Sequence, residues 1–395
     1  MRKPDRAGRY LRQSTGYRAF HPSPLPPDPP VFRDAELDDL HFKATLALGK
    51  LDGAAETLPN PDLFVFMYVR KEAVLSSQIE GTQASLIDVV EFEAGRRRPD
   101  GPKDVAEVVN YVRAMNHGLA RLQALPVSLR LIREIHRELL QDVRGHERSP
   151  GEFRTSQNWI GPAGCTLQTA SFVPPPPHEV QGLLGDLEQF IHAPDPMPAL
   201  LKVGLVHAQF ETIHPFLDGN GRVGRLLITF LLCEQGVLSR PLLYLSYFFK
   251  QHRADYYRLL QAVRDEGDWE SWLKFFLRGV AQVATEATTK ARRIAALRED
   301  HRSRISSELG RAAGNGLALH EHLFERPIVA VGDVARLTGV TFATANRLVD
   351  RLSALGVLTE TTGNQRNRVF AYTPYLEQFS DDQTGTPLPP ADVNG

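Results

Sequence analysis

The sequence has little cysteine, almost no net charge and no long apolar run. Its two cysteines, Cys165 and Cys233, are too few and too far apart for a disulfide framework or a cysteine zinc site. No apolar stretch reaches the roughly 18 residues that a membrane span needs. The N-terminal stretch MRKPDRAGRYLRQ has basic residues without an apolar segment behind them. The sequence therefore predicts a cytoplasmic protein with reduced thiols and no membrane segment.

The small net charge and two missing motifs argue against several classes of protein. A formal net charge of -1 gives no whole-molecule attraction to nucleic acid or anionic lipid, so a charged partner would have to meet a local patch. The chain has no HExxH zinc motif and no Walker P-loop, in which a lysine and a serine or threonine follow the last glycine. The rest is an ordinary globular composition: 395 residues, 42% of them hydrophobic, suffice for about two or three domains.

Apolar residues recur at helical spacing through most of the chain, so the predicted fold class is mainly α. Two proline-dense stretches in the first sixty residues, HPSPLPPDPPVF and LDGAAETLPNPD, are expected to wrap over the surface as an arm and not to enter a helix. Within this N-terminal region, 1–122, residues 61–81 are predicted to form an amphipathic helix that ends at Gly81. Further helices are predicted over residues 104–122, 129–141, 178–192, 198–212, 222–235, 254–266 and 269–299.

One segment inside the helical region has a different pattern. In residues 151–177, Asn158, Trp159 and Ile160 are expected to pair with residues 171–173 as two short strands around a Gly-Pro turn. A small β-hairpin flap in an α-helical core often lies beside a functional site.

The C-terminal part is predicted to be a separate module, beyond a helical core that we assign to residues 123–289. Residues 290–311 hold seven Lys/Arg against three Asp/Glu, which predicts a basic connecting helix over 290–312. Residues 313–380 follow the order of a winged helix-turn-helix: helix, strand, helix, short turn, helix and two strands. Residues 381–395 are expected to be disordered.

The predicted winged-helix module has little positive charge for a DNA-binding domain. Residues 317–378 contain six arginines, no lysine and six acidic residues, whereas domains that read DNA are usually clearly basic. Protein docking or dimerisation is therefore the favoured use of residues 313–380. DNA binding stays open, with Asn346, Arg347 and Arg368 among the side chains that would reach the DNA.

The stretch HPFLDGNGRVGR, residues 214–225, carries the strongest chemical signal. Gly219, Asn220 and Gly221 form a turn that leads into a predicted helix, where unpaired backbone N–H groups and the positive end of the helix dipole attract phosphate. Arg222 and Arg225 are three residues apart and share a helix face, so both planar side chains can reach further phosphate oxygens. The stretch is expected to bind a ligand with more than one phosphate.

Two more residues of the stretch would add a metal ion and a proton acceptor. Asp218 directly precedes the turn, and a carboxylate beside phosphates is a usual way to hold Mg²⁺. His214, with an ordinary pKa of about 6.5, is the residue of the stretch that most readily takes up a proton near neutral pH. The set favours a metal-nucleotide as ligand, although the turn could also be plain loop chemistry and His214 a core histidine.

Residues 214–225 resemble the motif HxFx(D/E)GNGRxxR of Fic proteins and match it at every specified position. The likeness extends to HAQFETIHPF, DYYRLLQAV, GDWESWLKFFL and PNPDLFVFMYVRKEAVLSSQIEGT, as in the larger bacterial members of the family. It covers nearly the whole chain. The resemblance implies an all-α core with a β-hairpin flap, and transfer of AMP from ATP to a hydroxyl of a protein substrate.

Carried over residue by residue, the resemblance implies that His214 deprotonates a target Ser, Thr or Tyr, that Asp218 holds Mg²⁺ and that the turn 219–221 binds phosphates. Arg222 and Arg225 would hold the β- and γ-phosphates and stabilise charge as pyrophosphate leaves.

The resemblance also assigns roles outside residues 214–225. The flap, with Asn158, Trp159 and Ile160, would clamp the target peptide by adding a strand. Tyr256 and Tyr257 would line the nucleoside pocket, or would simply pack their helix.

A second family element precedes the core. Ser76-Ser77-Gln78-Ile79-Glu80-Gly81 resembles the inhibitory pattern (S/T)xxxE(G/N). The resemblance implies that Glu80 pairs with Arg225 and removes its grip on the γ-phosphate. Taken alone, Glu80 before Gly81 could also be the last turn of a capped helix.

Together these inferences predict an autoinhibited, Mg²⁺-dependent protein adenylyltransferase that uses ATP. Two alternatives stay open: a transcriptional regulator whose core senses nucleotide, and a hydrolase in which Glu80 positions water to remove AMP from modified proteins. The resemblance favours a homodimer. The sequence does not name the target protein, and the chain itself is one candidate through auto-AMPylation.

Overall fold

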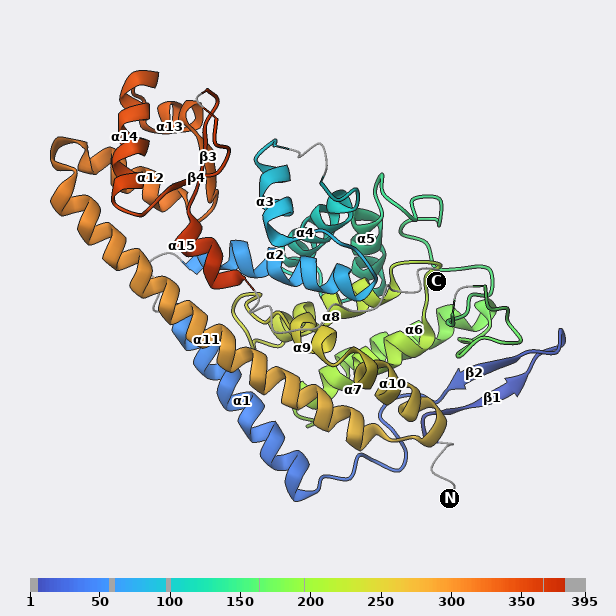
Figure 1. The fold of residues 1–395 in the computed structure, drawn as a ribbon. Helices are drawn as coiled ribbons and strands as arrows, with labels where there is room; N and C mark the ends of the chain where they lie inside the picture. Colours follow the sequence, from blue (N-terminus) through green and yellow to red (C-terminus); the bar gives the residue numbers. More distant parts are fainter. Residues whose placement is uncertain are drawn as a thin grey trace.

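The computed structural model is mainly helical, as expected, and describes residues 6–56, 61–96, 101–162, 164–194, 196–364 and 366–380 (Figure 1). The helices are α1 (Ala35–Glu56), α2 (Pro61–Ile79), α3 (Leu86–Glu93), α4 (Val105–Arg121), α5 (Leu129–Leu139), α6 (Pro177–His192), α7 (Ala199–Ile213), α8 (Asn220–Glu234), α9 (Ser246–Gln251), α10 (Arg253–Glu266), α11 (Trp269–Glu308), α12 (Ala313–His322), α13 (Val331–Thr338), α14 (Phe342–Ala354) and α15 (Thr373–Leu376). The strands are β1 (Gly8–Arg12), β2 (Arg18–Pro22), β3 (Ile328–Ala330), β4 (Thr359–Glu360) and β5 (Val369–Ala371). In the part of the chain that the structure describes, no helix combines the length and the hydropathy needed to cross a bilayer.

Helices α7 and α8 form the centre of the core. Every side chain of α7 from Leu200 to Ile213 is buried, and α8 is buried nearly throughout. A helix that is apolar and buried on all sides must be surrounded by other elements, and α2, α4, α5, α6, α10 and α11 pack against this pair. The loop between α7 and α8, residues 214–219, is therefore held at both ends by the most buried helices of the molecule.

The N-terminal arm contributes more structure than its prolines indicate. It contains an antiparallel hairpin of β1 and β2 and the 22-residue helix α1, which lies along α11 (Figure 1). Phe20 is fully buried, and its backbone N–H donates to the carbonyl of Val173 at 2.9 Å. The stretch LDGAAETLPNPD was expected to stay out of a helix, but α1 runs through its first residues to Glu56. A stripe of apolar residues on α1, including Leu37 and Leu48, meets the core and stabilises a helix that its flanking prolines do not predict.

The predicted helix 269–299 and the predicted connecting helix 290–312 form one continuous 40-residue helix, α11. The sequence has neither proline nor glycine between Gly279 and Gly310, so nothing interrupts the helix there. Its apolar stripe also continues, with Ala291, Ile294 and Ile305 buried. The basic residues between them leave the helix intact.

The C-terminal elements occur in the predicted order, α12, β3, α13, α14, β4 and β5, with a small antiparallel sheet ordered β3-β5-β4. Two of the expected DNA-facing side chains are already paired within this module: Arg368 Nη2 donates to Asn346 Oδ1 at 2.8 Å and lies 2.9 Å from Asp350 Oδ1. The winged-helix assignment and the domain boundaries stay predictions. The expected disordered tail, 381–395, lies outside the described residues.

The C-terminal part packs on α2, the helix that leads to Glu80. The ring of Phe379 meets that of Tyr68 edge-on at 5.5 Å between centroids. Lys71 Nζ, which is buried, donates to the carbonyl of Phe379 at 2.9 Å. The two aromatic rings and the satisfied lysine bind α2 firmly to the rest of the chain.

Candidate active site

The loop after α7 aims His214 into a cavity. His214 caps α7 with a φ of 51°, in the left-handed region that a non-glycine residue seldom occupies. Two flap residues hold this backbone: Arg154 Nε and Asn158 Nδ2 both donate to the carbonyl of His214, at 2.9 and 3.2 Å. These contacts fix the direction of the imidazole.

The side chain of Asn220 holds the next residues of the loop in a tight turn. Asn220 accepts from the backbone N–H of Phe216 through Oδ1 and donates to its carbonyl through Nδ2, both at 2.8 Å. Phe216 itself is fully buried and anchors the loop. The side chain of Asn220 therefore shapes the turn, while its backbone remains available to a ligand.

The turn leads into α8 as predicted. Gly219 adopts a φ of 78° as the N-cap, and the first helical hydrogen bond runs from Val223 N–H to the Gly219 carbonyl at 3.0 Å. The N–H groups of the first helical turn have no acceptor within the helix. They point with the helix dipole toward the cavity end of α8, which makes this end an anion site.

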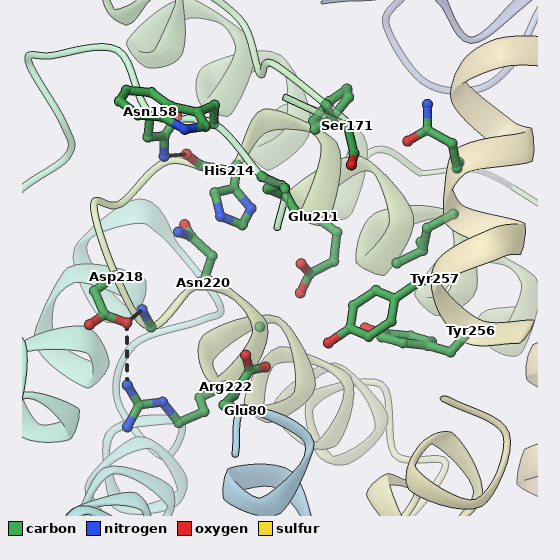
Figure 2. A pocket seen from close by; sticks show the side chains of 18 of the residues that line it. Glu80, Asn158, Ser171, Glu211, His214, Asp218, Asn220, Arg222, Tyr256 and Tyr257 are labelled. Carbon is green, nitrogen blue, oxygen red and sulfur yellow. Dashed lines mark hydrogen bonds and ion pairs between the residues drawn. The ribbon is translucent and has the colours of Figure 1, made fainter. Parts of the chain in front are cut away.

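A cavity of about 560 Å³ brings the predicted residues together (Figure 2). Its lining includes His214, Asp218, Gly219, Asn220, Gly221, Arg222, Arg225, Glu80, Asn158, Trp159, Ile160, Tyr256 and Tyr257. Ser76, on α2, and Gly81, in the turn after it, do not line the cavity but lie near Glu80 in the chain. Residues from positions 80 to 257 thus meet around one space.

His214 is neutral in this environment. Burial, followed by the charges of Arg154 and Arg264, lowers the pKa of His214 to about 3. Among the described residues, its Nδ1 has no hydrogen-bond partner. Because Nδ1 is closed to solvent, the proton of a bound hydroxyl would go to the other nitrogen of the neutral imidazole, Nε2, and the negative charge of a bound phosphate would raise its basicity.

Arg225 is held by the helix α2. Its Nη2 lies 2.6 Å from Glu80 Oε1 and donates to the Ser76 carbonyl at 3.0 Å, and its Nε donates to Ser76 Oγ at 2.7 Å. Burial works against ionisation of Glu80, but the charge and hydrogen bond of Arg225 bring the pKa of Glu80 below its ordinary value. The contact between Glu80 and Arg225 that the resemblance implies is therefore present.

Glu80 lies in the turn just after α2. Gly81 follows it with a φ of 99°, which glycine adopts without strain. A side chain at Gly221 would overlap the carboxylate of Glu80. The glycine of the anion turn thus also makes room for Glu80.

Arg222 has looser partners than Arg225. It is buried, and its terminal nitrogens lie 3.5 Å from both Asp218 Oδ1 and Glu107 Oε2. Its Nε has no partner among the described residues. Glu107 belongs to no recognisable sequence motif, so the sequence analysis did not predict it at this site. Arg222 therefore has unused donor capacity beside the anion site.

Asp218 suits a magnesium ion held jointly by protein and ligand. Its side chain is 25% exposed, lies at the anion site and accepts from the Gly219 N–H at 2.5 Å. In the described part of the chain, no group of three His, Cys, Asp or Glu residues could hold a metal. Mg²⁺ bound through one carboxylate, phosphates and water needs no such group.

His136 of α5 braces the loop and was also missed. Its Nδ1 accepts from the backbone N–H of Gly151 at 2.8 Å, so Nε2 carries the proton and donates to the Asp218 carbonyl at 3.0 Å. Its ring stacks on Phe216 with centroids 3.7 Å apart. A single histidine on the apolar face of a helix offers no sequence signal for this role.

The flap is less regular than predicted. Ile160 and Phe172 form one isolated antiparallel bridge, with N–H to O distances of 2.8 and 3.0 Å, in place of two strands. Pro162 has no N–H to extend the ladder on one side, and Pro174 has none on the other. Asn158 Nδ2 also donates to the Phe216 carbonyl at 2.8 Å, which fastens the flap to the catalytic loop.

Tyr256 and Tyr257 do different things. Tyr256 is buried and its hydroxyl lies 2.9 Å from His207 Nε2, whose other ring nitrogen lies 3.0 Å from the Gly224 carbonyl. With both ring nitrogens engaged in this way, His207 has a structural role. Tyr257 is 41% exposed and presents its ring to the cavity. Both residues line the cavity, and their role in a nucleoside pocket stays a prediction.

The fold and the loop at its centre define the class of protein: a helical Fic fold. Residues 39–120 match the Fic/DOC family N-terminal description, and residues 126–232 match the Fic/DOC family. The chain belongs to the Fic/DOC family.

Curated relatives match over part of their length. The chain is 31% identical over 202 residues to "Protein adenylyltransferase Fic" of Drosophila grimshawi, which covers 50% of this chain and 38% of that protein. It is 34% identical over 151 residues to the protein of that name from Aedes aegypti, which covers 38% of this chain and 27% of that protein. The chain thus matches well under half the length of these relatives.

Two solved structures show the same fold. A Fic family protein from Desulfovibrio desulfuricans G20 superposes with a TM-score of 0.58 at 20% identity, covering 87% of this chain and 97% of that one. A Fic domain containing signaling protein from Bacteroides thetaiotaomicron VPI-5482 gives 0.50 at 18% identity, covering 66% and 97%.

Proposed function

We propose that the protein is an autoinhibited, Mg²⁺-dependent protein adenylyltransferase that transfers AMP from ATP to a Ser, Thr or Tyr hydroxyl of a target protein. The observation that carries this proposal is the convergence of His214, the turn 219–221 and Arg225 on one cavity. Relatives that bear the name protein adenylyltransferase support it.

In this reaction the target hydroxyl enters beside the flap, and His214 accepts its proton. The hydroxyl oxygen attacks the α-phosphorus, and the bond from that phosphorus to the oxygen bridging to the β-phosphate breaks. AMP stays on the target and pyrophosphate leaves. Backbone N–H groups of the turn 219–221, with Arg222 and Arg225, stabilise the charge that develops on the phosphates. Mg²⁺ held by Asp218 would neutralise further phosphate charge.

Inhibition follows from the contact with α2. While Glu80 and Ser76 occupy the guanidinium of Arg225, that side chain cannot also grip the γ-phosphate with the same nitrogens. ATP then binds without the contact that would align its α-phosphate with the hydroxyl. Release of Glu80 would permit transfer.

The test is incubation of wild type, Glu80→Gly and His214→Ala with α-labelled ATP and Mg²⁺, with label read on the protein itself and on a cytosolic extract. We expect label to rise with Glu80→Gly and to vanish with His214→Ala. Retained transfer in His214→Ala would refute the base assignment, and unchanged label in Glu80→Gly would refute autoinhibition.

The position of Glu80 favours one second candidate, removal of AMP from modified proteins. Its carboxylate lies in the cavity beside Gly221, where it could orient a water molecule toward a phosphorus atom. In that case Glu80→Gly would lose hydrolysis of AMP-labelled protein and gain no transfer. The same variant therefore separates the two functions.

Homodimerisation, auto-AMPylation and a cytoplasmic location belong to the same hypothesis, whereas DNA binding through residues 313–380 belongs to the alternative of a transcriptional regulator. Sedimentation velocity reports the oligomeric state. Label on the purified chain alone reports auto-AMPylation. Salt-dependent, sequence-selective binding to DNA would favour a transcriptional regulator.

A further inference from the structure

Glu211 is a buried acidic side chain in the cavity that the proposed reaction does not use. It lies on α7, one turn before His214, and is 6% exposed. Its Oε1 lies against Gly224, is closed to solvent and has no hydrogen-bond partner among the described residues, so a ligand in the pocket would meet the other carboxylate oxygen. Figure 2 shows its carboxylate pointing into the pocket, in the space between His214 and Tyr257. A buried carboxyl group that the protein leaves without a donor costs free energy unless a ligand supplies one.

The surroundings of Glu211 keep its carboxyl in place without pairing it. Arg264 Nη2 donates to the backbone carbonyl of Glu211 at 3.1 Å, not to its carboxylate. Burial, together with the charge of Glu80, raises the pKa of Glu211 to about 7, against the opposing charges of Arg225 and Arg264. In either protonation state the group remains an acceptor that needs a partner.

Gly224 leaves the space that Glu211 occupies. A methyl group on Gly224 would overlap Glu211 Oε1 and would also lie 3.2 Å from the ring of Phe210. The Fic motif leaves position 224 unspecified, so the motif does not demand glycine there. The contact with Glu211 supplies a physical reason for it.

The layout of the cavity indicates which part of a nucleotide meets Glu211. Figure 2 shows Asp218 and Asn220, at the anion turn, on one side of the pocket and the ring of Tyr257, which is partly exposed, on the other. Glu211 lies between them. In a nucleotide the sugar joins the phosphates to the base, so a ligand that spans both ends places its sugar near the middle. A carboxylate that accepts hydrogen bonds from ribose hydroxyls is common chemistry in nucleotide sites.

We propose that Glu211 is a specificity-determining residue that accepts a hydrogen bond from a ribose hydroxyl of the nucleotide donor, with Gly224 as the position that admits its carboxylate. This inference rests on the proposed function only in that the donor is a ribonucleotide. It implies a preference for ribonucleotides over nucleotides that lack the 2′- and 3′-hydroxyls.

The test is equilibrium dialysis of the full chain with labelled ATP, 2′,3′-dideoxy-ATP and ITP, without a target protein. We expect the wild type to bind ATP about 10- to 100-fold more tightly than dideoxy-ATP, the range of a hydrogen bond to a charged group. Glu211→Ala should bring this ratio to within about twofold of one by weakening ATP, and should leave the ratio of ATP to ITP unchanged.

Two further variants make the result interpretable. Gly224→Ala keeps Glu211 in the chain but displaces its carboxylate, so it should also collapse the ratio. Glu72→Gln removes another buried carboxyl, whose partners are Ser246 and Tyr111 and which does not line the cavity, and should leave the ratio unchanged. Thermal unfolding shows that each variant is folded.

A ratio of ATP to dideoxy-ATP that survives Glu211→Ala in a folded protein would overturn the proposal. A change in the ATP to ITP ratio instead would overturn it too, because it would place Glu211 at the base. Since dialysis requires no transfer, a protein that discriminates ribose but labels no target would refute only the adenylyltransferase function. Failure of the wild type to bind ATP would overturn both.

Discussion

The helix α2 and the flap bound the same cavity from different sides, and they are built in opposite ways. Figure 2 shows Asn158 and Ser171 of the flap on one side and Glu80 on another. On α2, every side chain from residue 67 to residue 77 is buried. The flap has one β-bridge and a largely exposed or half-exposed chain between residues 157 and 171. The wall that we propose to be inhibitory is part of the core, whereas the wall that we propose to bind the target is a loop whose base is hydrogen-bonded to residues 214–216.

This difference has a consequence for regulation. Displacing Glu80 leaves the buried guanidinium of Arg225 without its carboxylate, and breaking a buried ion pair in this way typically costs about 3–5 kcal/mol. A flap with few internal hydrogen bonds can adjust to a target peptide at much lower cost. If the proposed inhibition operates, the inhibited state is the default, and binding of a target alone contributes too little free energy to displace α2.

The largest expected effect concerns the α2 side. In a Glu80→Gly background, Arg225→Ala should lower transfer by about 10²- to 10³-fold, because it removes the charged contact that Glu80 normally blocks. Label transferred from α-labelled ATP measures the effect. A Glu80→Gly gain that persists after Arg225→Ala would show that inhibition does not act through this arginine.

A smaller effect is expected on the flap side. Asn158→Ala removes hydrogen bonds of 2.8 and 3.2 Å to the catalytic loop, so transfer to a target should fall about 10-fold, while the affinity for ATP changes less than about twofold. Steady-state transfer and equilibrium dialysis measure the two quantities. Thr169→Ala is the control, because Thr169 bonds to Thr166 within the flap. An equal loss in the control would mean that the flap acts as a whole and not through its anchor.

Within α2, two neighbouring serines allow a matched comparison. Ser76 Oγ accepts from Arg225 Nε at 2.7 Å, whereas the buried Ser77 Oγ has no partner among the described residues. Ser76→Ala should weaken the hold of Ser76 and Glu80 on Arg225 and so raise transfer about fivefold, which corresponds to about 1 kcal/mol. Ser77→Ala should leave transfer unchanged. Equal transfer rates for both variants in the label assay would contradict the idea that Ser76 helps to hold Arg225 in the inhibited state.

The smallest effect on transfer is expected from pH, since His214 is already neutral. Its pKa of about 3 in the folded state lies below the value of about 6.5 in an unfolded chain. Between these values the unfolded state binds one more proton, so stability is lost as the pH falls from about 6.5. The wild type should lose about 1.4 kcal/mol per pH unit relative to His214→Ala.

Denaturant unfolding of both proteins at pH 6.5 and pH 5 measures this difference. Transfer by the wild type should stay nearly flat between pH 6.5 and pH 8. A difference in unfolding free energy that does not vary with pH would mean that His214 is not buried in its neutral form.

The parts that sequence reasoning predicted share one property: their geometry is local. Residues 214–225 are so close in the chain that turn chemistry and helix periodicity place His214, Asp218 and the anion turn together. Most helices were predicted because each shows its own apolar period. The contact from Glu80 to Arg225, 145 residues apart, was expected through the family resemblance and not through any physical pattern in the chain.

The sequence by itself determined the helical class, the anion turn and the pairing of a proton acceptor with a carboxylate beside it. The tertiary structure alone decided that α1 lies along α11, that the flap forms a single bridge, that His136 supports the loop and that Glu211 stands unpaired in the cavity. The physical reason is that burial and hydrogen-bond partners depend on residues far away in the chain. The sequence pattern around a helical histidine or glutamate is the same whether its side chain meets water, a backbone carbonyl or an open pocket, so the pattern cannot distinguish these environments.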